Sequence, residues 1–294
     1  MLKLILAMLI FGTIGIFRKM IPLSSAQLAF FRGAIGSVSL VLLVSIRRRK
    51  ILGRISRKNL IMLITSGAMI GVNWILLFEA YNYTTVSVAT LCYYMAPTFV
   101  VVLSAVLFRE PMSLRKGLCV ITALLGMVLI SGVAESGLPG VNELRGIFFG
   151  LAAACLYAAV VLENKRIQGV DGYDKTILQL GSAALVLVPY LAVTDGVTGI
   201  AWTPQVIILL LFVGIVHTGF SYALYFGSIE GVRTQTLALL SYIDPVTALI
   251  LSALLLHEKM TVLGLLGACM ILGAAIVSER ETGDGPVSPT LSSK

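Results

Sequence analysis

Ten stretches of the chain are long and apolar enough to cross a lipid bilayer as α-helices. They are residues 3–21, 25–46, 60–79, 84–107, 115–133, 146–164, 176–194, 205–226, 233–256 and 261–279. The hydrocarbon core of a bilayer is about 30 Å thick, which a helix of roughly 20 residues spans. Helices satisfy their own backbone hydrogen bonds in lipid. The sequence therefore predicts an all-α membrane protein with ten transmembrane helices.

The composition agrees with a membrane protein and excludes several other classes. Of 294 residues, 58% are hydrophobic and only 12% are charged, whereas about a quarter would be charged in a soluble domain. The net charge of +8 comes from basic residues in short loops, so we expect no nucleic-acid partner. Four cysteines stand singly in apolar stretches, without the spacing of a metal site or a disulfide framework. We expect no metal and no cofactor.

The distribution of lysine and arginine predicts the orientation of the chain. If the N-terminus lies in the cytoplasm, 17 basic residues fall on the cytoplasmic side and four on the outer side. Cytoplasmic loops are normally the basic ones. We therefore expect both termini to be cytoplasmic and the protein to lie in the inner (plasma) membrane. The first apolar stretch is followed by GTIGIFRK rather than a small-residue cleavage site, so we expect a first span and not a leader.

Two segments of the chain repeat each other at a distance of 148 positions. YYMAPTFVVVLSAVLFREPM (93–112) matches SYIDPVTALILSALLLHEKM (241–260), with nine identities in 24 ungapped positions between 91 and 114. The proline pair Pro97 and Pro245 and the acidic pair Glu110 and Glu258 are among them. We predict two five-helix repeats, at 1–134 and 146–279, followed by a polar tail at 280–294 that we expect to be disordered and cytoplasmic.

Five is an odd number of spans, so the second repeat must enter the membrane from the opposite side. Inverted repeats are the architecture of many secondary transporters, in which the substrate binds near the middle of the membrane where the halves meet. The repeat therefore predicts a central cavity, lined by four helices of each half, that opens alternately to the two sides.

Other features carry a resemblance to a known family. They are an arginine early in the second span (FFRG), the P-x₁₂-E pattern in spans four and nine, and a glycine-rich fifth and tenth span. In this order they resemble the EamA-type, ten-helix branch of the drug/metabolite transporter superfamily, over residues 3–279. The resemblance implies transport. It does not specify a substrate, because members export amino acids, other metabolites or drugs, and some import sugars or nucleotide precursors.

Asp244 and Pro245 stand in the middle of the ninth span. Proline removes a backbone donor and interrupts a helix, so Pro97 and Pro245 are candidate hinges. A carboxylate within the membrane is costly and normally faces a wet cavity. Asp244 is therefore a candidate for proton coupling or cation binding, with a hydrogen-bonded helix cap as the structural alternative. The repeat places Ala96 opposite it, so only one half carries the acid.

Three further charged or titratable residues are candidates for chemistry. Glu79 and His217 are proton-coupling candidates, with an interfacial carboxylate and an interhelical hydrogen bond as their respective alternatives. Arg32 is a counter-charge for an anionic substrate or for one of the acids, unless it snorkels to the outer headgroups. Glu110 and Glu258 are expected to cap the helices that follow them or to pair with Arg115 or Lys259.

Aromatic and amide side chains complete the predicted cavity, with Trp74 and its repeat counterpart Tyr222 on opposite walls. Aromatic belts at the membrane interface have the same composition and stay an alternative. The predicted cavity-lining residues are Asn73, Trp74, Glu79, Tyr81, Tyr94, His217, Tyr222, Tyr225 and Tyr242.

Together these features predict a secondary transporter for a small organic metabolite, amino-acid-like or amphipathic. No phosphate-binding loop is present, so uphill transport would draw on an ion gradient. We expect export by proton antiport with alternating access. The alternatives are an uncoupled facilitator or a lipid flippase. An integral-membrane enzyme is disfavoured, because the two histidines and the acids are scattered. The glycines of spans five and ten suit a dimer interface or packing within the monomer, so the oligomeric state stays open.

Overall fold

The computed structural model describes residues 1–46, 53, 55–108, 113–131, 139–194, 196, 200–229 and 240–283. Within these ranges the ordered elements are helices and no strand occurs. Glu110, the first part of the predicted ninth span and the tail beyond residue 283 lie outside the described residues.

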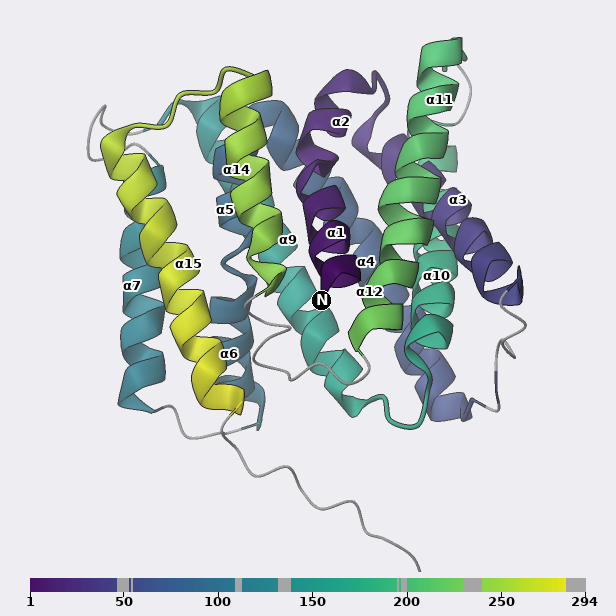
Figure 1. Ribbon diagram of the computed structural model, residues 1–294, viewed down its shortest axis with the longest axis horizontal. Helices are drawn as coiled ribbons and strands as arrows, with labels where there is room; N and C mark the ends of the chain where they lie inside the picture. The colour runs from purple at the N-terminus through teal and green to yellow at the C-terminus, as the bar shows by residue number, and fades with distance from the viewer. Residues whose placement is uncertain are drawn as a thin grey trace, which may run out of the picture.

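The helices correspond to the ten predicted spans (Figure 1). The first half contains α1 (Leu2–Gly12), α2 (Ile14–Met20), α3 (Ser25–Ile46), α4 (Arg57–Tyr83), α5 (Val86–Tyr93), α6 (Ala96–Phe108) and α7 (Leu114–Ile130). The second half contains α9 (Val141–Arg166), α10 (Gly172–Val193), α11 (Pro204–Phe212), η1 (Val213–Phe220), α12 (Ser221–Ile229), α14 (Ile243–Leu255) and α15 (Val262–Gly283). Within the described chain, 6 helical stretches are long and apolar enough to cross a membrane. The predicted all-α membrane fold is confirmed.

Local sequence signals set where several helices begin. The side chains of Ser56, Thr85, Ser113 and Thr203 each accept a hydrogen bond from the backbone N–H three residues further on. Such a cap satisfies one of the backbone donors that the first turn of a helix leaves free. The capping residues therefore fix the starts of α4, α5, α7 and α11.

Several spans are interrupted or distorted in mid-course. The first span breaks at Thr13, between α1 and α2, and the fourth breaks at Tyr94 and Met95, between α5 and α6. The helix α14 begins just after Tyr242. Pro97 and Pro245 lie in the first turns of α6 and α14, where a missing backbone donor costs little. The candidate hinges thus stand directly after an interruption.

The eighth span contains a π-helical segment, η1, between α11 and α12. There the Thr218 hydroxyl donates to the carbonyl of Val213 at 3.2 Å, and the Ser221 hydroxyl donates to that of Val216 at 2.7 Å. Both bonds join residues five apart, which is the spacing of a π-helix. Such segments are rare in proteins, and those that occur are often found at functional sites. This one brings His217 and Thr218 into the interior.

Two pairs of helices that join the halves run in opposite directions. The chain just after α14 reaches the N-terminus of α5, where Glu258 accepts from the backbone of Val86, so α14 is antiparallel to α5 (Figure 1). The helices α7 and α15 also pack antiparallel. A Cβ on Gly126 would lie 2.7 Å from the carbonyl oxygen of Gly267, so the two backbones touch. Gly126 of span five and Gly267 of span ten therefore serve packing within the monomer.

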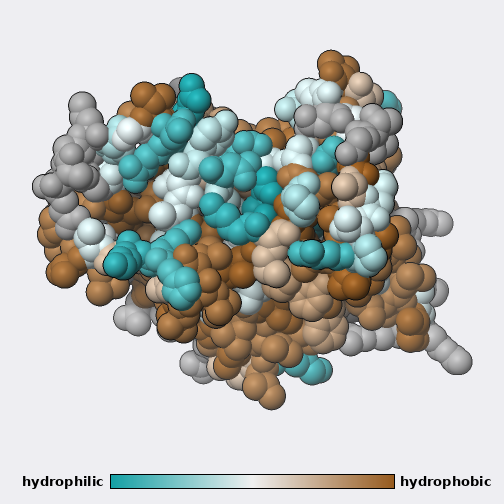
Figure 2. Space-filling view, turned by 90° about the horizontal axis from the view of Figure 1, so that it is seen from above, coloured by the Kyte–Doolittle hydropathy of each residue, from teal (hydrophilic) through white to brown (hydrophobic). Residues whose placement is uncertain are grey.

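The interior is divided into two apolar clusters. The larger is built mainly on α3, α4 and α10, with Leu28, Phe78 and Leu180 at its centre, and the smaller joins α5, α7 and α15 around Leu91 and Ile271. The helix flanks expose large apolar side chains, as a surface in contact with lipid does. Seen from above, hydrophilic residues gather in a band across the end of the molecule, and hydrophobic residues fill the flank beside it (Figure 2).

Candidate functional site

The two halves of the molecule meet at a hydrogen bond between Tyr94 and Asp244. The Tyr94 hydroxyl, at the interruption between α5 and α6, donates to a carboxylate oxygen of Asp244 at 2.7 Å. Asp244 stands in the first turn of α14, beside Pro245. The ring of Tyr242 lies 6.4 Å from that of Tyr94, so the interruptions of both repeats are neighbours. Within the described residues this is the one hydrogen bond of the Asp244 side chain, and the residue is partly exposed.

Arg32 lies deep in the same region, on α3. Its side chain is 6% exposed, and its guanidinium carbon lies 4.4 Å from the ring centre of Trp74. The Nε group donates to the hydroxyl of Thr218 at 3.2 Å. A cation over an indole face is favourable, and more so away from water. The structure therefore directs Arg32 inward, and the alternative of snorkelling to the headgroups does not apply.

Tyrosines surround the two charges. Tyr81, Tyr93, Tyr222 and Asp244 all lie within electrostatic range of Arg32. Tyr81 is buried, and its hydroxyl lies 3.4 Å from that of Thr90. We name the following set the central cluster: Arg32, Trp74, Tyr81, Tyr93, Tyr94, Tyr222 and Asp244. It includes both members of the predicted pair Trp74 and Tyr222, and it offers one cation, one carboxylate and several phenols.

His217 lies on η1, beside the central cluster, and is fully buried. Its Nε2 atom lies 2.9 Å from the Thr13 hydroxyl, at the break between α1 and α2. Its ring is packed edge-on against Phe17 and Phe212. The Nδ1 atom is enclosed and has no hydrogen-bond partner in the described chain. This arrangement matches the interhelical hydrogen bond that the sequence left as the alternative to proton coupling.

Two other predicted cavity residues, Asn73 and Glu79, make their hydrogen bonds outside the central cluster. Asn73 is buried and donates to the backbone carbonyl of Ala153 at 2.5 Å, so it joins α4 to α9. Glu79 is half-buried near the end of α4, where it accepts from Asn82 at 3.4 Å and lies within electrostatic range of Arg18. Tyr225 follows Tyr222 by one turn on α12 and is half-buried. For Asn73 the structure favours a packing role, and for Glu79 a place in a separate polar network.

Glu258 forms a second link between the halves. It stands in the segment between α14 and α15, which lies at the end of the molecule drawn uppermost in Figure 1. Its carboxylate accepts from the backbone N–H groups of Val86 at 2.9 Å and Ser87 at 3.2 Å, and from the hydroxyl of Ser252. The Ser87 and Ser252 hydroxyls are 3.0 Å apart. We name these contacts the outer latch. The expectation that Glu258 caps the helix following it is wrong: it caps α5, in the other repeat, because the antiparallel packing brings that N-terminus to it.

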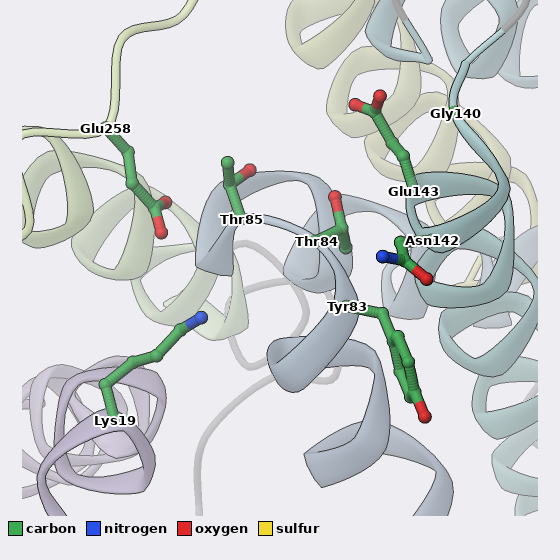
Figure 3. Close-up of a pocket in the computed structure, with 8 residues that line it drawn as sticks. All are labelled: Lys19, Tyr83, Thr84, Thr85, Gly140, Asn142, Glu143 and Glu258. Carbon is green, nitrogen blue, oxygen red and sulfur yellow. The ribbon is translucent and has the colours of Figure 1, made fainter.

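A hollow of about 450 Å³ lies beside the outer latch (Figure 3). Its lining residues are Lys19, Tyr83, Thr84, Thr85, Gly140, Asn142, Glu143 and Glu258. The side chains of Lys19 and Glu258 point toward one another across it. Because the hollow combines residues of α2, α4, α9 and the segment after α14, it lies where the two halves meet at this end.

Sequence reasoning missed several residues that position the site. Thr13 makes a hydrogen bond with His217, and Thr218 accepts one from Arg32. The sequence contained a signal for each: Thr13 stands between Gly12 and Gly15, and Thr218 directly follows a histidine within a span. Tyr157 packs on Tyr93 with ring centres 5.5 Å apart. No local pattern marks Tyr157, because its relation to Tyr93 exists only once α9 has packed on α5. Within the described ranges, no cluster of metal-ligating side chains occurs.

The fold and the site define a class: a multi-pass membrane transporter built from two halves around an interior polar cluster. The model of the EamA-like transporter family matches residues 1–132 and again residues 144–279. The chain therefore belongs to the EamA-like transporter family.

Individual relatives cover most of the chain. It is 28% identical to the uncharacterized transporter YxxF of Bacillus subtilis over 98% of this chain and 92% of that protein. It is 26% identical to the uncharacterized transporter YoaV of the same organism over 85% of this chain and 84% of the relative. Protein PecM of Dickeya dadantii is 25% identical over 71% and 69%. A solved crystal structure shares the fold with a TM-score of 0.66 over 95% of this chain and 97% of its own, at 18% identity.

Proposed function

We propose that this protein is a secondary transporter that exports a small organic metabolite by proton antiport, with alternating access to a site at the central cluster. The observation that carries the proposal is the hydrogen bond between Tyr94 and Asp244. It joins the interrupted fourth span of one half to the start of α14 in the other half. A titratable contact between two halves that must move relative to one another is a suitable coupling element.

Asp244 is the proposed proton-coupling residue. A charged carboxylate accepts the Tyr94 hydroxyl in a charge-assisted hydrogen bond, about twice as strong as a neutral one. Protonation of Asp244 weakens that bond and removes a charge that lies within electrostatic range of Arg32. Binding or release of one proton therefore changes both the contact between the halves and the charge of the site, which is what coupling to a proton gradient requires.

The outer latch is the proposed gate on the side that we predict to be extracytoplasmic. It ties the segment after α14 to the start of α5 by two backbone hydrogen bonds and a serine pair. Opening the site to that side requires these bonds to break, with Pro97 and Pro245 as the proposed hinges. Glu79 and His217 stay secondary candidates for coupling, outside the central cluster.

The proposal is tested in liposomes that contain the purified protein and the trapped pH dye pyranine. A panel of amino acids, aromatic acids, amines and neutral amphiphiles is added outside, and an antiported compound moves protons and changes the dye signal. We expect at least one compound to do so, and the Asp244→Asn variant to abolish the proton signal. Uptake without proton movement would indicate a facilitator. Movement of a fluorescent lipid in place of soluble compounds would indicate a flippase. Either result contradicts the proposal.

A further inference from the structure

Arg32 is a buried cation whose donors are mostly unused. A guanidinium offers five N–H donors, and in the described part of the chain the Arg32 guanidinium makes one hydrogen bond, through Nε. No carboxylate there lies within ion-pair distance of it. Neither Nη group has a hydrogen-bond partner in the described chain, although the residue is only 6% exposed. The free end of the guanidinium is therefore available to a ligand.

Arg18 provides an internal comparison. It is also 6% exposed, but its Nη groups donate to the carbonyl of Ile21 at 3.1 Å and to the side-chain oxygen of Asn82 at 2.9 Å. The fold thus supplies acceptors to both Nη groups of Arg18, whose buried Nε has no partner, whereas for Arg32 it supplies an acceptor to Nε alone. Burying an unpaired charge is costly. An anion that binds from outside the chain would offset that cost for Arg32.

We propose that Arg32 is the receptor for the carboxylate of the transported compound, and that the compound also carries an aromatic or apolar body. The planar fork of a guanidinium matches the two oxygens of a carboxylate. Around it the walls are aromatic: Trp74 and Phe78 face the guanidinium at 4.4 Å and 5.9 Å, and Tyr93 and Tyr222 lie within electrostatic range. The inference rests on the proposed transport function and names its substrate class.

Asp244 fits this assignment without competing for Arg32. In the described chain the Asp244 side chain accepts a hydrogen bond from Tyr94 and none from the guanidinium, so Arg32 stays available when Asp244 is charged. The two charged groups therefore serve as separate sites, Arg32 for the substrate carboxylate and Asp244 for the proton.

The chain allows a direct binding assay, because it has two tryptophans and one of them, Trp74, faces Arg32. Trp202 is exposed, so Trp202→Phe leaves Trp74 as the sole indole reporter. The purified variant is titrated with 3-phenylpropionate, the neutral 3-phenylpropanamide and the cationic phenethylamine, and its fluorescence is excited where phenyl groups do not absorb. We expect a saturable change with 3-phenylpropionate alone. Arg32→Gln should weaken it about ten-fold or more, and Arg32→Lys should weaken it less.

The controls separate the receptor from the fold and from transport. Arg18→Gln should lower thermal stability and leave 3-phenylpropionate binding within about two-fold, because its partners belong to another network; each variant is first checked for native elution in detergent.

An equal response to the amide or the amine, an unchanged response in Arg32→Gln and Arg32→Lys, or no response to 3-phenylpropionate would overturn the inference. Proton-coupled export of an amine, without carboxylate binding, would overturn it and leave the proposed function intact. Carboxylate binding at Arg32 without any transport would support the inference and contradict the proposed function.

Discussion

At the scale of single residues, Tyr94 and Tyr93 form a natural pair for testing the contact between the halves. Tyr94→Phe removes the hydroxyl that donates to Asp244 at 2.7 Å and keeps the ring. We expect a loss of about 1.5–3 kcal/mol in the free energy of unfolding, since a hydrogen bond to a charged group contributes on this order. Tyr93→Phe is the matched control, because the Tyr93 hydroxyl makes no hydrogen bond in the described chain. Denaturant titration in detergent measures both, and equal losses would contradict the assignment.

The identities of the central residues were largely predictable from the sequence. Arg32 and Asp244 are charged groups inside apolar spans, and Trp74 pairs with Tyr222 through the repeat, so each stood out without coordinates. Asn73 and Glu79 were grouped with them because they are polar or charged and stand near Trp74 and Tyr81 in the sequence. Nearness in the sequence does not show what a side chain contacts, and Asn73 contacts the backbone of α9.

At the scale of helices, the contact between α7 and α15 depends on the absence of side chains at two glycines. A Cβ on Gly267 would lie 2.5 Å from the carbonyl oxygen of Gly126, so the backbones must separate to admit it. We expect Gly267→Ala to lower the stability of the protein by about 1–3 kcal/mol. Gly273→Ala on the same helix is the control, because nothing lies within 4 Å of its Cβ position. Similar unfolding curves for the two variants would argue against this close packing.

The break in the first span and the π-helix of the eighth are joined by the pair Thr13 and His217, whose side chains lie 2.9 Å apart. A double-mutant cycle with Thr13→Val and His217→Phe isolates the interaction. We expect a coupling energy of about 1 kcal/mol, the usual contribution of one buried hydrogen bond. Strictly additive losses of unfolding free energy would mean that the two distortions are independent of one another.

At the scale of the whole molecule, the number of spans and their repeat followed from the sequence because apolar length and the match of 93–112 to 241–260 are properties of the chain itself. The outer latch did not follow. Glu258 and Val86 are 172 positions apart, and their meeting depends on how the two halves pack. Because α5 and α14 run antiparallel, Glu258 binds the N-terminus of α5 in the other repeat and does not cap the helix that follows it.

Movement of the two halves at the outer latch is the central claim of this account, and a reversible cross-link tests it most directly. In a variant with the four native cysteines replaced, Ser87→Cys and Ser252→Cys place two thiols where the hydroxyls lie 3.0 Å apart. Transport of a compound identified with the pyranine assay is then measured before oxidation, after disulfide formation and after reduction. We predict that the disulfide stops transport and that reduction restores it. Transport at an undiminished rate with the disulfide fully formed would contradict alternating access through this gate.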